Sequence, residues 1–145
     1  MQLKPTIGID NLKFGITQKE IYEVIGIPNR KRVDEIDSNE LYLEFNNLLL
    51  RLTIYRDENN RLGYIQTSNP ELEFNNHRII NATIEFVKKE IFGEIISDWE
   101  IEDYDTFSTH GNEEYWVMLN VEYGKVISAE LGLTFNEEDE YIWPD

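Results

Sequence analysis

Ser108 and His110 are the residues in this sequence that come closest to a catalytic pair. They place a hydroxyl and an imidazole two residues apart in the chain. Residues at this spacing rarely present the geometry of a nucleophile and its base, and no G-x-S-x-G turn surrounds them. We therefore expect residues 108–111 to form a polar loop between two strands and to carry no catalysis.

A second stretch, from Asp57 to Gly63, has the acidic and amide side chains of an EF-hand calcium loop. The sixth position of such a loop must be glycine, but it is Leu62 here, and the twelfth position lacks the bidentate glutamate. The stretch instead predicts a hairpin turn.

Few residues remain that could carry chemistry. The chain has no cysteine, which excludes disulfides, thiolate nucleophiles and zinc–thiolate sites, and its two histidines, His77 and His110, are far apart. With 29 Asp and Glu residues, any pair of carboxylates is unremarkable, and no glycine-rich phosphate loop is present. We predict a protein that is not an enzyme and needs neither a cofactor nor a metal.

Acidic clusters interleaved with aromatic residues are the most distinctive pattern. Trp and Tyr are the usual buried anchors of protein interfaces, and a charged rim steers a partner of opposite charge. For Trp99 and Trp116 the alternative is a place in the core, and for Tyr141 and Trp143 anchor and core are both open. The predicted partner-binding residues are Glu100, Glu102, Asp103, Asp105, Glu113, Glu114, Glu137, Glu138, Asp139, Glu140, Tyr141 and Trp143.

The charge distribution indicates the class of partner. The net charge is −16, with nine Lys/Arg against eleven Asp/Glu in residues 1–72 and four against eighteen in residues 73–145. A surface this acidic would repel phosphate, so direct nucleic-acid binding is disfavoured and a basic protein is favoured. Solubility alone is the alternative explanation of the acidity.

Two helices are expected to support these segments. Thr17 and Glu20 form a capping-box pattern, followed by Ile21, Val24 and Ile25 on one face and a stop at Gly26. In the second half Asn81 is the expected N-cap and Gly93 the expected stop. The apolar positions of that second helix are Ile80, Ile84, Val87 and Ile91.

Strands are expected after each helix. Apolar runs at 41–45, 48–55 and 62–67 are separated by Asn46-Asn47 and by the turn at 57–60, and they predict an antiparallel meander. A second meander is expected from the runs 95–104, 115–123 and 126–135. Sequence leaves open whether the two meanders join edge to edge or pack face to face.

The resulting prediction is an α+β fold of tandem helix-plus-antiparallel-meander repeats. We expect one compact domain over 1–145 with pseudo-repeat halves at about 1–72 and 73–145, because this length suits one core. No signal peptide or membrane-spanning run is evident, so we expect a cytoplasmic protein that does not contact membranes.

The pattern resembles the immunity proteins of bacterial polymorphic-toxin and contact-dependent growth inhibition systems. The resemblance rests on residues 12–21 and 78–85, which enter the two helices, on the turn Tyr123-Gly-Lys-Val and on the closing Tyr-Ile-Trp-Pro. The order of elements is also similar to the beta-lactamase-inhibitor-like architecture. The resemblance implies an inhibitor that binds a cognate toxin domain, in many systems a nuclease, and blocks its basic active site. A housekeeping protein-binding or assembly module with an unknown partner is the alternative.

Overall fold

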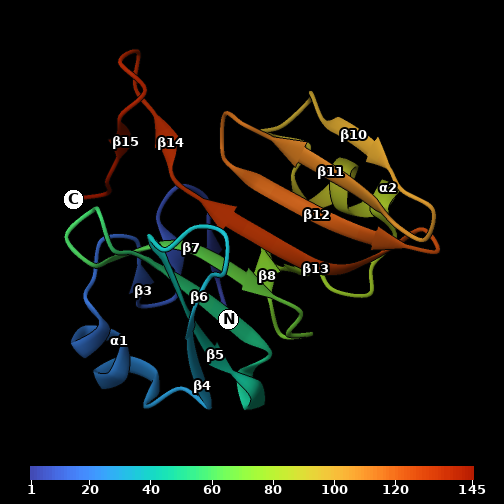
Figure 1. Ribbon diagram of the computed structural model, residues 1–145. Helices are drawn as coiled ribbons and strands as arrows, with labels where there is room; N and C mark the ends of the chain where they lie inside the picture. The colour runs from blue at the N-terminus through green and yellow to red at the C-terminus, as the bar shows by residue number, and fades with distance from the viewer.

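The computed structural model describes residues 1–145, and its main element is one eight-stranded antiparallel sheet. Figure 1 shows the sheet running through two lobes, each formed by a four-stranded meander. In spatial order its strands are β10 (Glu100–Asp103), β11 (Ser108–Asn112), β12 (Val117–Glu122), β13 (Lys125–Gly132), β7 (Arg61–Thr67), β6 (Leu50–Tyr55), β5 (Glu40–Phe45) and β4 (Arg30–Val33).

The two meanders join edge to edge, which resolves the alternative that the sequence left open. Strand β13 pairs with β7 in antiparallel register, from Ala129 opposite Thr67 to Gly132 opposite Tyr64. These four residue pairs join the two meanders into one sheet, and both strands are also hydrogen-bonded to a neighbour within their own meander.

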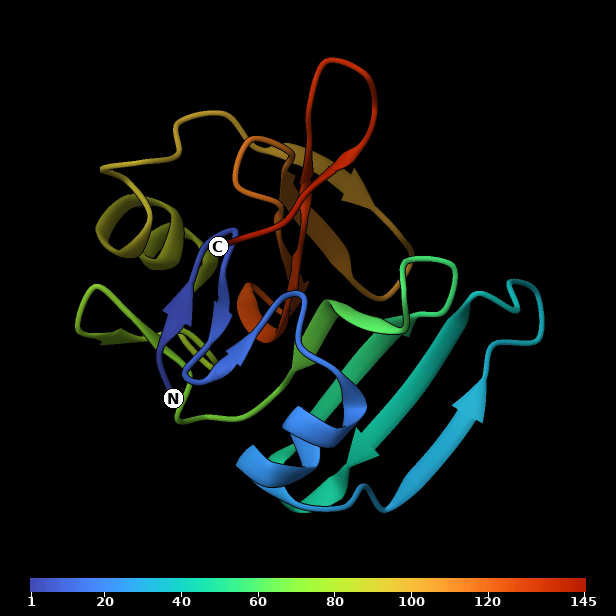
Figure 2. The ribbon, with the colours of Figure 1, turned by 90° about the vertical axis from the view of Figure 1, so that its left-hand side faces the viewer.

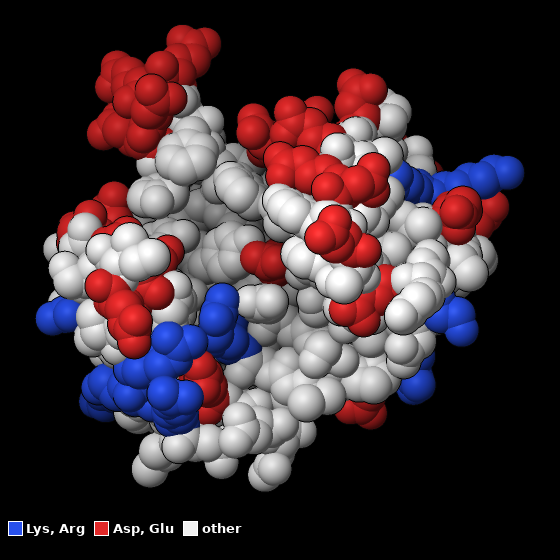
Figure 3. Space-filling model, turned by 45° about the vertical axis from the view of Figure 1, so that its right-hand side comes forward, with Lys and Arg blue, Asp and Glu red and all other residues white.

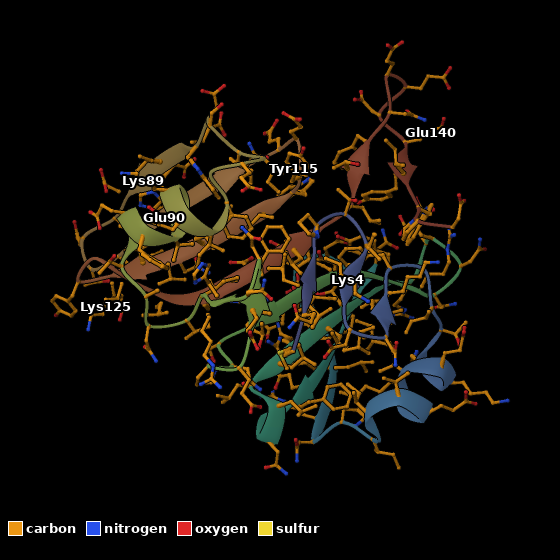
Figure 4. The ribbon with its side chains drawn as sticks, turned by 180° about the vertical axis from the view of Figure 1, so that it is seen from behind. Lys4, Lys89, Glu90, Tyr115, Lys125 and Glu140 are labelled. Carbon is orange, nitrogen blue, oxygen red and sulfur yellow. The ribbon has the colours of Figure 1, made fainter.

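Small sheets and two helices complete the structure. One small sheet contains β1 (Leu3–Lys4), β2 (Gly8–Ile9) and β3 (Leu12–Lys13), a second pairs β8 (Glu73–Phe74) with β9 (His77–Arg78), and a third pairs β14 (Thr134–Phe135) with β15 (Tyr141–Ile142). The helices are α1 (Gln18–Ile25) and α2 (Ile84–Phe86); α2 continues as a π-helical segment (Val87–Ile91), and Asn46–Leu48 form a 3₁₀ turn. Both helices cover the same face of the large sheet, as the rear view shows (Figure 4).

The prediction of an α+β fold built from tandem helix-plus-meander repeats is wrong. The protein is mostly antiparallel sheet, with 43 % of its residues in strands and 13 % in helices. The second helix contributes least, because regular α-helical geometry lasts only from Ile84 to Phe86 before the π-helical segment begins. The two lobes also share one core. A single cluster of 28 buried apolar residues includes side chains from both lobes and from the β1–β3 sheet, which lies between them in Figure 2.

Helix α1 starts as predicted, but its buried stripe is narrower than expected. The Thr17–Glu20 capping box is present and the helix ends at Gly26. Ile21 is fully buried, whereas Val24 is 44 % exposed and, with the half-buried Ile25, borders an open surface cavity of about 530 Å³. Helix α1 is therefore attached to the core mainly through Ile21, and its last turn lies at the surface.

The second helix starts later than predicted. Thr83, rather than Asn81, provides the N-cap, since its hydroxyl accepts a hydrogen bond from the amide of Phe86. Asn81 instead adopts a left-handed conformation with φ 73°. The predicted apolar positions Ile80, Ile84, Val87 and Ile91 are all buried.

Three segments differ from the predicted strands and turns. The expected loop at 108–111 lies within strand β11, and strand β10 begins at Glu100 rather than near residue 95. The expected two-residue turn at Asn46-Asn47 is a 3₁₀ turn that ends at Leu49 in a left-handed conformation. The Asp57–Asn60 segment is a hairpin turn between β6 and β7, as predicted.

Candidate functional site

The candidate site lies on the outer face of the large sheet, opposite the helices. Successive side chains of a strand point to opposite faces, so in β5 the buried Leu41, Leu43 and Phe45 alternate with residues that face outward. The register then aligns Tyr42, Thr53 and Tyr64 in one row across three strands. The outer face of the first meander is therefore polar and aromatic.

Two glycines allow aromatic rings to lie flat on this face. A Cβ atom on Gly63 would lie 2.2 Å from ring atoms of Tyr55, and one on Gly132 would lie 3.1 Å from the Tyr64 ring and 3.5 Å from Trp116. Tyr64 and Trp116 meet edge to face with their centroids 6.1 Å apart. The absence of a side chain at the two glycines therefore leaves the space that the three rings occupy.

These rings form part of a hollow of about 310 Å³ that we call the aromatic hollow. Its lining residues come from β5, β6, β7, β13, the turn before β12, and the β14–β15 hairpin. They are Glu40, Tyr42, Arg51, Thr53, Tyr55, Tyr64, Trp116, Glu130, Gly132, Leu133, Phe135 and Tyr141. Figure 3 shows a recess with mainly white, uncharged residues at its base and acidic projections on both sides.

A hydrogen-bonded carboxylate belongs to the lining of the aromatic hollow. The hydroxyl of Tyr64 donates to Glu130 Oε1 at 2.6 Å, and the side-chain amide of Asn120 donates to Oε2 at 2.8 Å. Burial, followed by the charge of Glu130, raises the pKa of Tyr64. The phenol therefore stays protonated at neutral pH and remains a donor that holds the carboxylate in place.

Tyr42 lies between two arginines on the same face. The guanidinium carbons of Arg32 and Arg51 are 4.7 Å and 4.4 Å from the centre of its ring. Arg32 also pairs with Glu44 at 3.1 Å, and Arg51 donates to Gln66 at 2.9 Å. Burial and a hydrogen bond to a neighbouring glutamate raise the pKa of Tyr42 to about 12. These contacts hold two guanidinium groups on the β4–β6 side of the outer face.

The C-terminal segment folds back as the β14–β15 hairpin and forms one wall of the hollow. Tyr141 stacks on Tyr55 with centroids 5.3 Å apart and contacts Phe135 at 4.9 Å. Trp143 meets Tyr141 at 5.9 Å, and the guanidinium of Arg61 lies 3.7 Å from its ring centre. Both Tyr141 and Trp143 are half-buried against the core, so these two rings attach the hairpin to the first lobe.

The structure separates the predicted acidic residues into three places. Glu137–Glu140 occupy the exposed tip of the hairpin, and Glu113 and Glu114 lie in the turn between β11 and β12, next to Trp116. Figure 4 shows Glu140 on the projecting hairpin and Tyr115 on the facing end of the second meander. These two groups flank the aromatic hollow.

The third acidic group is not part of the hollow. Glu100, Glu102 and Asp103 lie on β10, the exposed edge strand of the second lobe, and Asp105 follows in the turn. Strands β11 and β12 separate β10 from β13, a distance of roughly 14 Å at the usual strand spacing. Charged edge strands are a common protection against edge-to-edge aggregation.

Trp99 and Trp116 occupy different environments. Trp99 is half-buried and packs edge to face on Phe92 with centroids 5.8 Å apart, at the border of the core. Trp116 lines the aromatic hollow. Of the two roles that the sequence left open, a place at the border of the core applies to Trp99, whereas the position of Trp116 suits an interface residue.

Ser108 and His110 come closer together than their spacing suggested. Because both lie on one face of β11, Ser108 Oγ is 3.2 Å from His110 Nε2. Nδ1 of His110 is buried without a hydrogen-bond partner, so nothing orients the ring as a catalytic base requires. The structure also contains no group of three or more His, Asp or Glu residues that could hold a metal ion.

Buried His110 should make the free energy of unfolding depend on pH. Burial, followed by the charge of Lys88, lowers its pKa below the usual 6.5, while Asp103 and Glu85 act in the opposite direction. A histidine with a lowered folded-state pKa stabilises the fold above pH 6.5, and that stability is lost as the pH falls from 6.5 toward the folded-state pKa.

We therefore expect the free energy of unfolding to decrease between pH 7.5 and 5.5 more in the wild type than in His110→Gln. Urea titrations at several pH values measure this difference. Equal slopes for the two proteins would contradict the assigned role of His110.

Sequence reasoning missed most residues of the aromatic hollow. Tyr42, Tyr55, Tyr64, Arg51 and Glu130 lie inside strands, four of them in the half that carries little net charge. One available signal was the alternation in residues 41–45 and 50–55, which places these polar and aromatic side chains opposite the leucines. Their convergence on one hollow depends on strand register, which the alternation does not specify.

Comparisons with known proteins provide information on the fold alone. No protein-family model matches the chain, and no curated protein matches it. One solved structure is similar, an extracellular protein containing a SCP domain from Bacillus anthracis strain Ames, with a TM-score of 0.55 and 12 % identity. The match covers 90 % of this chain and 49 % of that protein, so the chain spans about half its length.

None of the helices of this protein could span a lipid bilayer.

Proposed function

We propose that this protein binds a basic partner protein through the aromatic hollow. The observation that carries the proposal is the position of the hollow between the acidic hairpin tip and the acidic β11–β12 turn. Tyrosine and tryptophan supply large contact area at low entropic cost, and charged residues at a rim accelerate encounter with a partner of opposite sign.

Basic residues on one side of the outer face favour one orientation of a bound partner. Arg30, Lys31 and Arg32 lie on edge strand β4, across the sheet from the acidic projections. Figure 3 shows the corresponding blue patch at the lower left, below the hollow. A uniformly basic partner surface would be repelled there, so the basic region of the partner should face the hairpin and the second lobe.

A specific form of this proposal is that the protein is the immunity protein of a toxin. It rests on the sequence resemblance, and the acidic and aromatic surface supports it through its chemistry. A nuclease must have a basic cleft to bind phosphates. Carboxylates at the hairpin tip could occupy phosphate positions, while rings of the hollow could occupy positions of bases. The protein would then inhibit the toxin by competing with nucleic acid.

The second candidate function is a protein-binding or assembly module. The structural similarity favours it in one respect, since the comparable fold covers about half of a longer extracellular protein. The two candidates differ in their partner. An immunity protein should neutralise a toxin domain encoded next to it, whereas a module should bind a protein that has no toxic activity.

The proposal is tested by kinetic measurements with a basic partner protein, to be sought first among the products of the neighbouring genes. We expect the association rate to fall roughly tenfold or more between 50 and 500 mM salt, because long-range attraction is screened over about 8 Å at physiological ionic strength. Changing Glu137, Glu138 and Glu140 to Gln and Asp139 to Asn should slow association at low salt.

A matched control carries four changes to Gln at exposed glutamates away from the hollow, namely Glu23, Glu71, Glu90 and Glu94. It removes the same charge and should slow association less. Equal slowing by both variants, or association that does not depend on salt, would count against binding at the hollow. Tight binding without neutralisation of toxicity would remove only the immunity assignment.

A further inference from the structure

We infer that the aromatic hollow is a specific site for one arginine side chain of the partner. This inference rests on the proposed function and adds the chemical group that the hollow recognises. A guanidinium is planar, stacks on aromatic faces and is weakly hydrated, so it suits a ring-lined site that also contains carboxylates.

The protein already places its own arginines on aromatic rings of this region. Arg32 and Arg51 lie over Tyr42, and Arg61 lies over Trp143, at 3.7–4.7 Å from the ring centres. The ring pairs that line the hollow, Tyr64 with Trp116 and Tyr55 with Tyr141, have no such cation over them. No guanidinium of this chain therefore covers these rings, although Tyr55 and Tyr141 cover one face of each other.

The charges of the lining also favour a cation. Glu40 and Glu130 carry two negative charges, and Arg51 carries the one positive charge. Arg51 is engaged with Tyr42 and Gln66, so it offsets one carboxylate without filling the hollow. Glu130 accepts one hydrogen bond at each oxygen, from Tyr64 and from Asn120. Each carboxylate oxygen can accept a second hydrogen bond, so a guanidinium could still bind Glu130.

The size and rigidity of the hollow suit a side chain. Its volume of about 310 Å³ is at the lower end of the roughly 300–1,000 Å³ of small-molecule sites. Gly63 and Gly132 leave room for Tyr55, Tyr64 and Trp116, and these rings are restrained in the free protein by the hydrogen bond of Tyr64 to Glu130 and by their contacts with neighbouring rings. Little side-chain entropy is then lost when a cation enters.

Titration with Nα-acetyl-arginine amide, followed by ¹H–¹⁵N NMR, tests this site on the folded protein. We expect saturable shifts of the Trp116 indole and the Gly132 amide with a dissociation constant on the order of millimolar, since one ring-bound cation supplies only a small free energy. The citrulline analogue has nearly the same shape without the charge and should bind at least roughly fivefold more weakly.

Two variants with the same change in net charge separate the hollow from general electrostatics. Glu130→Gln should weaken arginine binding roughly fivefold or more, while Glu94→Gln, at an exposed position away from the hollow, should leave it unchanged. Equal binding of citrulline and arginine, equal effects of the two variants, or no saturable shift at the hollow would each overturn the inference. Because the probe is a single amino-acid derivative, this result is independent of whether a toxin binds.

Discussion

Replacing Ile65 with alanine should lower the free energy of unfolding by about 3–4 kcal/mol. Ile65 is fully buried in β7, between Leu52 of β6 and Leu131 of β13, so its side chain lies at the junction of the two lobes. Removing it leaves a cavity that strands bonded on both sides cannot easily close. Urea denaturation followed by circular dichroism measures the loss.

If tryptophan fluorescence is recorded in the same experiment, it also tests whether the two halves unfold cooperatively. Trp99 packs within the second lobe, on Phe92, and Trp116 and Trp143 contact residues of the first lobe, so fluorescence weights the two halves differently from circular dichroism, which sums their strands. If the chain is one domain, as the sequence predicts, the two signals should follow one transition in the wild type and in Ile65→Ala. Ile36→Ala is the control, because Ile36 is 97 % exposed and should change stability by less than about 0.5 kcal/mol. Separate transitions for the two signals would show that the halves unfold independently.

Local patterns predicted the elements that depend on neighbouring residues. The capping box at Thr17 and Glu20 and the apolar runs at 41–45 and 48–55 are encoded within a few residues, and the structure shows the capping box and strands β5 and β6 at these places. Strands β4 and β11 were missed because Arg30–Val33 is mostly charged and Ser108–Asn112 has no apolar alternation. Their pairing partners, β5 and β12, hold them in the sheet despite this composition.

The overall arrangement could not be predicted because it depends on contacts between distant residues. The junction of β7 and β13 pairs residues more than 60 positions apart, and no local pattern selects this pairing over face-to-face packing. The aromatic hollow depends on the same junction, since Gly132 of β13 lies opposite Tyr64 of β7. The acidic clusters were visible in the sequence because charge needs no register. The rings between them were not, because their convergence depends on the sheet.

The structure also changes the interpretation of the C-terminal aromatic residues. Sequence left open whether Tyr141 and Trp143 are interface anchors or core residues, and in the folded chain both pack on the first lobe. Tyr141 combines the two roles, because it stacks on Tyr55 and also lines the hollow. Trp143 does not line the hollow and has Arg61 over its ring, so its position suits attachment of the hairpin.

Replacing Trp143 with alanine should therefore release the β14–β15 hairpin. The free energy that holds the hairpin on the first lobe should fall by about 2–3 kcal/mol. The loss includes the contacts of the ring with Arg61, with Tyr141 and with the backbone near Gly15. Strands β14 and β15 pair over only two residues each, and an isolated two-stranded hairpin is marginally stable in water. The amides of Asn136 and Asp139, which are hydrogen-bonded within the hairpin, should then exchange with solvent roughly 30-fold or more faster.

Comparison with two other variants separates attachment of the hairpin from direct contact with a partner. Trp143→Phe keeps a ring beneath Arg61 and should preserve most of the protection. Neutralising Glu137–Glu140 should leave the protection factors nearly unchanged, because these side chains lie at the exposed tip and make only one hydrogen bond there, from the side chain of Asn136 to Glu140. Hydrogen exchange of the free protein is the decisive measurement. If Trp143 were an interface anchor alone, Trp143→Ala would speed dissociation of a partner and leave exchange in the free protein as it is. If Trp143 attaches the hairpin, exchange must increase before any partner is added, and binding weakens because Tyr141 no longer holds its wall of the aromatic hollow.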